Sequence, residues 1–352
     1  MTKILFICKK RSNYGSDDST LNINSSYGSY GLMNSCLLVK KALETTFPDD
    51  IEAKVVSVID NNAIDKEVHD YRPSHVIIEA LWVVPEKFLE LIPLHPHVKW
   101  VVRIHSKTPF LSNEGVAFNW MGRYLDIKKK YPHSMFLSGN DYEFCQDMSD
   151  SYNKDFTYLP NVYLVDKGYK FVEPRPDTRY VDIGCFGAIR PMKNQMEQAV
   201  AAVLYANEVG KTLRFHMNGS RTEQRGEEVL KNITAFLFGT GHELILHGWY
   251  PHAEFVELVK KMDVGLQVSF SESFNIVAAD FVTSDVPIVV SDDIRWASSF
   301  FKTSTTNAEE IKHKIAMAIK WRKLNLQYLN KLGLRKYNYL AVDAWMNFIF
   351  EQ

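Results

Sequence analysis

Two cations stand close together where the sequence predicts the start of a helix. In "GAIRPMKNQMEQAV", residues 187–200, Arg190 and Lys193 follow an apolar run and precede a helical pattern. Cations at a helix N-terminus oppose the helix dipole unless an anion lies between them. Arginine grips two phosphate oxygens through its planar fork, lysine adds a mobile point charge, and Gly187 permits a close backbone approach. The pattern indicates an anion site, and two solvated surface cations are the alternative.

A second polar stretch places two carboxylates around another predicted helix start. In "SFSESFNIVAADFVTSDVPIVVS", residues 269–291, Glu272 lies in a loop and Asp280 follows eight residues later, on the helix. A carboxylate in that position can accept hydrogen bonds from paired ribose hydroxyls. The backbone amides at the helix start can donate to an anion. The alternative is that Glu272 only complements the helix dipole. The candidate amides belong to Ser273, Phe274, Asn275 and Ile276.

These motifs together carry a resemblance to a known family. "GAIRPMKN", "ESFNIVAAD" and "DVPIVVSD" resemble the donor half of retaining glycosyltransferases of family 4, which have the GT-B fold. The resemblance covers roughly residues 180–295 and includes "LHGWYPHAEFVELVKKMDVGL", similar to the family's segment flanking the base. It implies that Arg190 and Lys193 bind the diphosphate of a nucleotide-sugar, while Glu272 and Asp280 handle the sugar and the ribose. A UDP-sugar is the expected donor.

The resemblance also implies roles for further residues. His105 ends a predicted strand, where family members carry a histidine near the donor sugar; a structural histidine is the alternative. The implied catalytic group is Arg190, Lys193, Glu272 and His105. The other implied donor-binding residues are Gly187, Asn218, Gly248, Trp249, Tyr250, Ser273, Phe274, Asn275, Ile276, Asp280 and Gly31.

Two residues depart from the family pattern. Asp280 is one methylene shorter than the family's glutamate, and Asn275 stands where the family commonly has glycine. The first departure is expected to shift the ribose contact and the second to crowd the sugar side. No DxD motif occurs in the chain, so we expect neither a metal nor a cofactor, the two cations supplying the charge that a metal would provide.

The acceptor is less clearly indicated by the sequence. Residues 73–115 resemble glycosyltransferase-like proteins of large bacteriophages, which implies a hydroxymethylated pyrimidine in phage double-stranded DNA as the first expectation. A protein or surface glycan is the alternative acceptor. A non-catalytic nucleotide-sugar or nucleic-acid binding protein is the alternative of another class. The candidate contacts to backbone phosphates are the basic side chains of Lys9, Arg11, Lys128, Lys129 and Lys130.

The elements that must position these residues follow from the alternation of apolar runs and helical patterns. This alternation predicts α/β architecture, with parallel sheets covered by helices on both faces. Strands are predicted over residues 3–8, 52–60, 73–81, 98–106, 134–140, 180–187, 213–219, 243–249, 264–270 and 287–292. Two Rossmann-like domains facing a cleft are expected, over residues 1–165 on the acceptor side and 166–325 on the donor side. A linker is predicted around 162–179, and helices over 326–352 are expected to return to the first domain.

Composition narrows the class of protein. The chain has 352 residues, of which 46% are hydrophobic and 24% charged, with a formal net charge of -1. These values are typical of a soluble globular protein with two domains and argue against a surface covered in basic charge. Four cysteines lack CxxC spacing, which favours a reduced, cytoplasmic protein. No apolar run is long enough for a membrane span, and a monomer or weak oligomer is expected.

Overall fold

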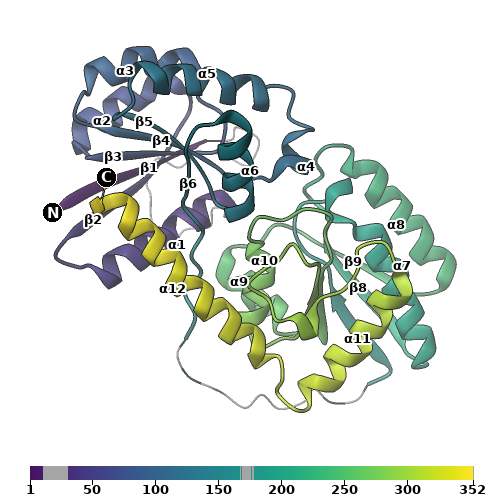
Figure 1. The fold of residues 1–352 in the computed structure, drawn as a ribbon. Helices are drawn as coiled ribbons and strands as arrows, with labels where there is room; N and C mark the ends of the chain where they lie inside the picture. Colours follow the sequence, from purple (N-terminus) through teal and green to yellow (C-terminus); the bar gives the residue numbers. More distant parts are fainter. Residues whose placement is uncertain (11–30, 167, 169–175, 177, 352) are drawn as a thin grey trace. The chain divides into compact units, whose positions relative to one another are not determined.

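The computed structural model describes residues 1–10, 31–166, 168, 176 and 178–351. Arg11, most of the predicted loop 12–31 and part of the predicted linker lie outside these residues. The described chain divides into two compact units. The first unit comprises the described residues up to Leu164 and those from Asn338 onward, and the second comprises those from Val165 to Tyr337. Each unit contains one parallel sheet, as Figure 1 shows.

The first unit is built on a six-stranded parallel sheet with the order β2-β1-β3-β4-β5-β6. Its strands are β1 (Thr2–Lys9), β2 (Ile51–Val58), β3 (His75–Glu79), β4 (Lys99–Ile104), β5 (Met135–Gly139) and β6 (Phe156–Tyr158). Its helices are α1 (Gly31–Thr46), α2 (Ile64–Tyr71), α3 (Phe88–Leu94), α4 (Thr108–Leu111), α5 (Ala117–Lys130) and α6 (Tyr142–Tyr152).

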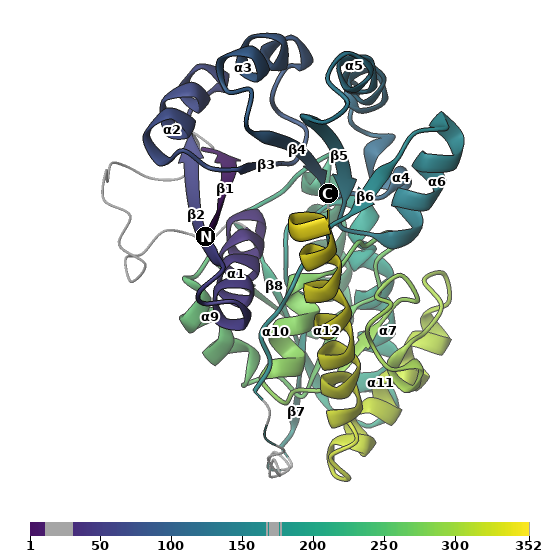
Figure 2. The same cartoon turned by 60° about the vertical axis from the view of Figure 1, so that its left-hand side comes forward.

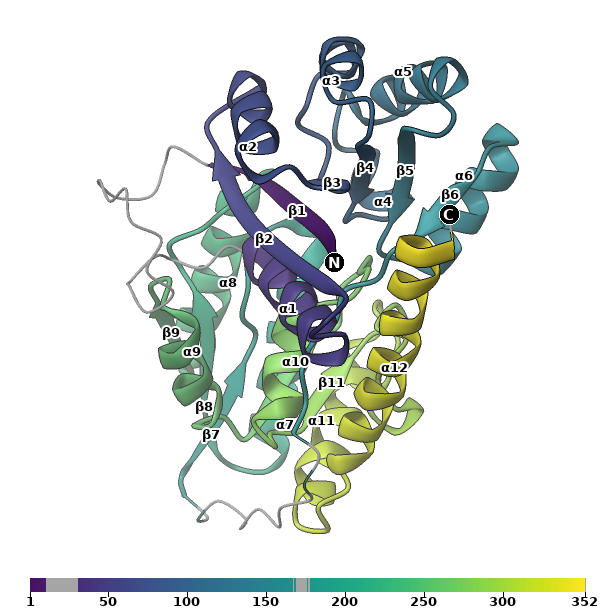
Figure 3. The same ribbon diagram turned by 90° about the vertical axis from the view of Figure 1, so that its left-hand side faces the viewer.

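Helices cover both faces of this sheet. Helices α2, α3 and α5 lie on one face and α1 on the other, as Figure 3 shows. All five residues of β3 are buried, and the three at its centre, Val76, Ile77 and Ile78, form the apolar run seen in the sequence. The order of the central strands places the ends of β3, β4 and β5 side by side at one edge. We call this the carboxyl edge, because parallel strands all end there.

The second unit has a five-stranded parallel sheet with the order β11-β10-β7-β8-β9. Its strands are β7 (Tyr180–Gly184), β8 (Thr212–Asn218), β9 (Glu243–His247), β10 (Val264–Gln267) and β11 (Ile288–Val290). Its helices are α7 (Gln195–Glu208), α8 (Gly226–Thr240), α9 (His252–Val259), α10 (Ile276–Thr283) and α11 (Ala308–Arg322). Helices α7, α8 and α11 cover one face, and α9 and α10 the other, as Figure 1 shows.

The last helix, α12 (Tyr328–Glu351), is one continuous helix in Figure 2, and the division between the units falls within it. Its second half belongs to the first unit. There the Trp345 Nε1–H donates to the carbonyl of Pro160 at 2.8 Å, and the Trp345 ring lies 5.8 Å from that of Phe6. Asn338 exchanges side-chain hydrogen bonds with both backbone groups of Tyr163. The helix therefore completes the core of the first unit.

The predicted α/β architecture with two Rossmann-like sheets is confirmed. All ten predicted strands are present, and the structure adds α4, α5, α6 and β6, which the sequence pattern did not identify. The domain limits drawn from the sequence stay predictions. Among the helices that the structure describes, none has both the length and the apolar composition required to cross a membrane.

Candidate functional site

The two polar motifs of the second unit meet at the point where its strand order reverses. Strands β7 and β10 are neighbours, and the chain runs outward from them in opposite directions across the sheet. Ligands of open α/β sheets bind beyond the carboxyl edge at such a reversal. The loop after β7 carries Arg190 and Lys193, and the loop after β10 carries Glu272 and Asn275. The fold therefore brings together side chains that are far apart in sequence.

The first of these loops depends on Gly187. Its φ of +111° lies in a region that side-chain-bearing residues rarely adopt. The Gly187 N–H donates to Asn218 Oδ1 at 2.9 Å, and Asn218 Nδ2 donates to the carbonyl of Gly248 at 3.1 Å. Three predicted donor-binding residues, from the ends of β7, β8 and β9, are thus joined by hydrogen bonds.

Backbone and amide contacts hold the two loops against each other. The Phe270 N–H donates to the carbonyl of Met192 at 3.0 Å. Asn194 Nδ2 donates to the carbonyl of Val268 at 3.1 Å, and the Val268 N–H donates to Gln198 Oε1 at 2.9 Å. These bonds fix the spacing of the loops without using the charged side chains that they carry.

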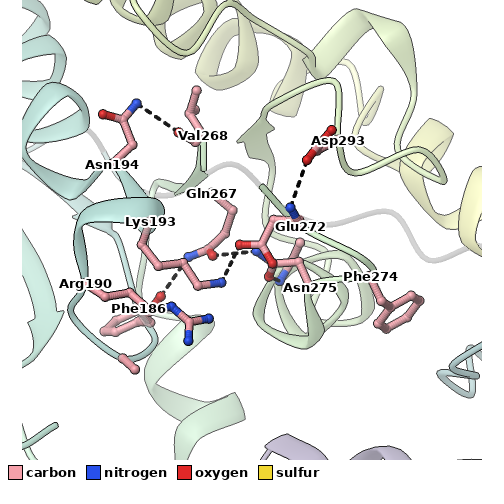
Figure 4. A network of polar contacts seen from close by, with 12 residues as sticks. Phe186, Arg190, Lys193, Asn194, Gln267, Val268, Glu272, Phe274, Asn275 and Asp293 are labelled. Carbon is pink, nitrogen blue, oxygen red and sulfur yellow. Dashed lines mark hydrogen bonds and ion pairs between the residues drawn. The ribbon is translucent and has the colours of Figure 1, made fainter. Parts of the chain in front are cut away.

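Lys193 and Glu272 form an ion pair between the loops, as Figure 4 shows. Both side chains are largely buried, with exposed fractions of 13% and 9%. Burial lowers the pKa of Lys193, and the neighbouring charge of Arg190 lowers it further, against the opposing effect of Glu272. The Glu272 N–H donates to Asp293 Oδ2 at 2.9 Å. An anion bound between the loops would compete with Glu272 for the ammonium of Lys193.

Arg190 is held from the other side by a carboxylate that the sequence analysis missed. Its Nη1 lies 3.2 Å from Glu223 Oε2. Glu223 also accepts from Arg221 Nε at 2.7 Å, and the Arg221 guanidinium lies 5.1 Å from the ring centroid of Trp249. Glu223 lies in the loop after β8. A carboxylate in a polar loop that follows a strand was the sequence feature that could have pointed to this residue.

Asn275 combines a left-handed backbone conformation with a side chain that caps α10. Its φ of 66° lies in the left-handed region, which glycine favours and asparagine tolerates. Its side chain caps α10 by accepting from the Ala278 N–H at 2.9 Å. The side-chain amide donates to Gln267 Oε1 at 2.8 Å, and Gln267 donates to the carbonyl of Phe186 at 2.8 Å. The side chain therefore turns into the protein, toward α10 and β10 (Figure 4).

Phe274 likewise points its side chain away from the loop. The ring is buried, with its centroid 5.9 Å from that of Trp296 and 5.4 Å from that of Tyr337. The Phe274 carbonyl accepts from Trp296 Nε1 at 2.8 Å. Of Phe274, only the backbone N–H fits the predicted role. Ser273 and Ile276 flank the start of α10 and are half-buried.

Asp280 lies on α10 and is buried. Its Oδ1 is 2.7 Å from Nε2 of His252, the first residue of α9. This hydrogen bond raises the pKa of His252. A ribose hydroxyl at Asp280 would share this carboxylate with His252, a partner that the sequence analysis did not identify. Tyr250 follows β9, and its ring centroid lies 6.1 Å from that of His247, the last residue of this strand.

His105 belongs to the first unit and directly follows β4. Its Nε2 is hydrogen-bonded to Glu79 Oε2, and Arg103 contacts the same carboxylate. The sequence analysis assigned no role to Glu79 or Arg103. The sequence did offer a sign of this pair: each of two largely apolar strands contains one charged residue. A charge in a buried strand requires a partner, so the two charges could have been expected to meet.

The predicted phosphate-contacting lysines do not gather around His105. Lys128, Lys129 and Lys130 end α5, which precedes β5, so they lie at the edge where the strands begin. Lys128 Nζ donates to the carbonyl of Asp155 at 3.0 Å, and Lys129 pairs with Asp126 at 2.7 Å. The exposed Lys9 ends β1 at the carboxyl edge, and Gly31, also exposed, begins α1. Within the described residues, no three His, Cys, Asp or Glu side chains are grouped as metal ligands.

Comparison with known proteins extends the description of the fold. No protein-family model matches the sequence, and no curated protein is detectably similar to it. Among solved structures, Anabaena HepE in complex with UDP and glucose has a TM-score of 0.66 at 11% identity, covering 100% of both chains. An alpha,alpha-trehalose-phosphate synthase (UDP-forming) from Burkholderia vietnamiensis has a TM-score of 0.60 at 12% identity, covering 83% of this chain and 78% of the synthase.

A third similar structure is a point mutant of S. aureus TarM in complex with fondaparinux, alpha-GlcNAc-glycerol and UDP. Its TM-score is 0.57 at 10% identity, and the match covers 78% of this chain but only 55% of TarM. At such identities the likenesses speak for the fold alone. They show that the chain has the GT-B fold, with one Rossmann-like domain in each unit.

Proposed function

We propose that this chain is a retaining glycosyltransferase that moves a sugar from a UDP-sugar to an acceptor hydroxyl. One observation carries the proposal: Arg190, Lys193 and Glu272 are assembled by two hydrogen-bonded loops at the reversal point of the second sheet. This placement fits a diphosphate between the two cations. The family resemblance of the same motifs and the UDP bound by similarly folded proteins support the choice of donor.

In the proposed reaction, the acceptor oxygen forms a bond to the anomeric carbon of the sugar as the bond to the diphosphate breaks. The acceptor attacks from the face that the diphosphate leaves, so the configuration is retained and the hydroxyl proton passes to an oxygen of the departing diphosphate. Negative charge grows on the departing diphosphate, and the charges of Arg190 and Lys193 stabilise it. Glu272, which pairs with Lys193, is proposed to contact the sugar once that ammonium binds phosphate. His105 is proposed to act near the sugar.

The donor site is tested by changing Arg190 to Ala and measuring UDP affinity by calorimetry. Glu223 keeps Arg221 as a partner in this variant, so the loop retains a neutralised carboxylate. Loss of a charge-assisted contact is expected to cost about 1.5–3 kcal/mol, which corresponds to a roughly 10- to 150-fold weaker Kd. Lys260→Ala is the control, since that exposed lysine directly follows α9 and pairs with Glu257 on the surface. Equal UDP affinity in both variants would refute the assignment.

Metal independence is part of the proposal. Two cations at the diphosphate can do the electrostatic work that a divalent ion does in other transferases. Transfer should therefore persist in EDTA. Loss of transfer in EDTA with recovery on adding manganese would show that a metal is required.

For the acceptor, we propose a hydroxymethylated pyrimidine in double-stranded DNA. The support is the phage-like character of residues 73–115 and the exposed Lys9 at the carboxyl edge; Lys128, Lys129 and Lys130 lie at the opposite edge and add nothing to it. The protein would be incubated with UDP-sugars and either plain or hydroxymethylated DNA, and the DNA then analysed by mass spectrometry. A mass gain of one sugar on the modified DNA alone is expected. A gain on a peptide or glycan acceptor instead would identify the alternative acceptor class.

A non-catalytic nucleotide-sugar binding protein is the second candidate. The observation that favours it is Asp280, a shorter carboxylate already hydrogen-bonded to His252. Slow hydrolysis of the donor without acceptor separates the two candidates, because a pure binding protein releases no UDP.

A further inference from the structure

A group of buried charged and polar side chains lies at the carboxyl edge of the first sheet. Glu79 is the last residue of β3, Arg103 lies in β4, and His105 directly follows β4. The side chains of Glu79 and Arg103 have no exposed surface. A buried ion pair is expensive to desolvate and adds little stability over an apolar pair. Its presence beside a strand-end histidine therefore calls for a reason other than stability.

Arg103 is fixed by acceptors on every side of its guanidinium. Its Nη1 lies 3.1 Å from each carboxylate oxygen of Glu79. Its Nη2 donates to Asn161 Oδ1 at 2.6 Å, and its Nε donates to the carbonyl of Leu159 at 2.8 Å. The ring of Trp345 lies 5.2 Å from the guanidinium carbon. This cation is immobile and stands permanently beside Glu79.

The fixed cation determines the protonation state of Glu79. Burial by itself would raise the pKa of Glu79, but the charge of Arg103 and the contact with His105 outweigh it and hold the pKa below its ordinary value. Glu79 is therefore an ionised carboxylate at neutral pH. An ionised carboxylate can only accept hydrogen bonds.

The state of the imidazole follows from that of the carboxylate. His105 Nε2 has two neighbours, Glu79 Oε2 and, at the longer distance of 3.4 Å, Arg103 Nη1. Because the ionised carboxylate is the closer partner and can only accept, Nε2 carries the proton. Burial lowers the pKa of His105, with Arg103 acting in the same direction and Glu79 opposing, so the ring is neutral at pH 7. Nδ1 is then the accepting nitrogen. Asn140 Nδ2 lies 3.4 Å from it, and a hydroxyl that binds Nδ1 would replace this long contact. An unprotonated imidazole nitrogen accepts hydrogen bonds, so Nδ1 is suited to bind the hydrogen of a hydroxyl group.

We infer that Glu79 is a positioning residue that locks His105 in the Nε2–H tautomer and presents Nδ1 as a hydrogen-bond acceptor for a substrate hydroxyl. The tautomer follows from the contacts of the first unit alone. The part about a substrate hydroxyl rests on the proposed sugar transfer. The two parts are separable by experiment, because the first has a spectroscopic readout that needs no substrate.

The first experiment measures nitrogen-15 shifts of the His105 ring by NMR in the full chain, with the signal assigned by its loss in His105→Gln. A protonated Nε2 and an unprotonated Nδ1 are expected at pH 7–8. A ring protonated on Nδ1, or charged at pH 7, would overturn the inference with the wild-type protein alone. The only variant needed is His105→Gln, which serves to assign the signal.

The second experiment compares Glu79→Gln with Glu90→Gln, an exposed glutamate of α3 that pairs with Lys87. A glutamine at 79 can donate as well as accept, so it no longer dictates the tautomer. A mixture of tautomers at His105 is expected in Glu79→Gln and the wild-type signal in Glu90→Gln. An unchanged His105 signal in Glu79→Gln would overturn the positioning role.

Sugar transfer provides the readout of the second part. In Glu79→Gln, kcat is expected to fall about 10- to 100-fold, as when the partner of a functional histidine is removed, with UDP affinity unchanged. Glu79→Asp, which keeps the charge, should recover part of the loss. Normal transfer despite a changed tautomer would show that Nδ1 binds no substrate. If the wild-type protein transfers no sugar, the proposed function fails while the NMR result still decides the tautomer.

Discussion

At the scale of single residues, Lys193 shows how burial and charge compete. Its ammonium is paired with Glu272 in a site where burial lowers the lysine pKa. UDP binding requires the charged form, so affinity should fall as pH rises, beginning below the ordinary lysine pKa of about 10.4. Glu272→Gln removes the charge that opposes the shift, so the fall should begin at a lower pH. Calorimetric titration with UDP from pH 7 to 10 measures both curves.

UDP without its sugar is the suitable probe, because the proposed contact of Glu272 with the sugar is then absent. Identical pH curves for the wild type and Glu272→Gln would show that the ion pair does not control the lysine charge.

Asn275 combines a left-handed backbone with a helix cap, and two substitutions separate these roles. Asn275→Ala removes the cap and puts at φ 66° a residue that tolerates the left-handed region less well than asparagine, so it should lower the free energy of unfolding by about 2 kcal/mol. Asn275→Gly removes the cap but relieves the backbone, so it should cost less. Urea unfolding of both variants measures the difference. A glycine variant less stable than the alanine variant would contradict the backbone argument.

At the scale of elements, two glycines on neighbouring strands set the distance between α10 and the sheet. Gly184 of β7 and Gly265 of β10 are paired in register, and Phe281 of α10 lies over both. A β-carbon at Gly265 would lie 2.6 Å from the ring of Phe281. The loop with Glu272 and Asn275 leads directly into α10. The contact of Phe281 with the sheet therefore also sets the position of the candidate donor site.

Gly265→Ala should therefore destabilise the second unit by about 1–3 kcal/mol through overpacking, and it should weaken UDP binding by displacing α10. The control is Gly239→Ala in α8, where a β-carbon would meet nothing within 4 Å and alanine favours the helix. Thermal unfolding with and without UDP measures both effects. Equal stability of the two variants would mean that α10 is not positioned by this contact.

At the scale of the whole molecule, each of the two units has its own sheet and core, and α12 contributes to both. Trp345 on this helix is fully buried in the first unit. Replacing Trp345 with Ala should lower the stability of the first unit by about 3–5 kcal/mol. UDP should raise the unfolding temperature of the second unit by mass action. Scanning calorimetry is expected to show two transitions. Trp345→Ala should lower the temperature of one, and UDP should raise the temperature of the other.

Tyr339→Ala is the matched control on the same helix, since that side chain is 77% exposed. A Trp345→Ala variant whose UDP-sensitive transition moves as far as the other would contradict separate unfolding of the two units.

The amino-acid sequence alone was enough to predict the strands, the helices that separate most of them, and the loops able to carry chemistry. Parallel strands buried on both faces appear as apolar runs, and their loops follow at the ends. Four elements were missed. Helix α4 and strand β6 have only four and three residues, whereas α5 and α6 each bury apolar side chains along one face and had a readable pattern. The motif around Arg190 and Lys193 was readable because both cations lie within four residues of each other.

Which of these residues are partners became clear only from the folded chain. Lys193 meets Glu272 because β7 and β10 are neighbours in the sheet, although 79 residues separate them in sequence. The order β3-β4 likewise joins Glu79 to Arg103, and the direction of α5 places its lysines at the opposite edge from His105. Local sequence governs backbone conformation and burial pattern, whereas contacts between distant side chains depend on strand order, which arises only when the whole sheet packs.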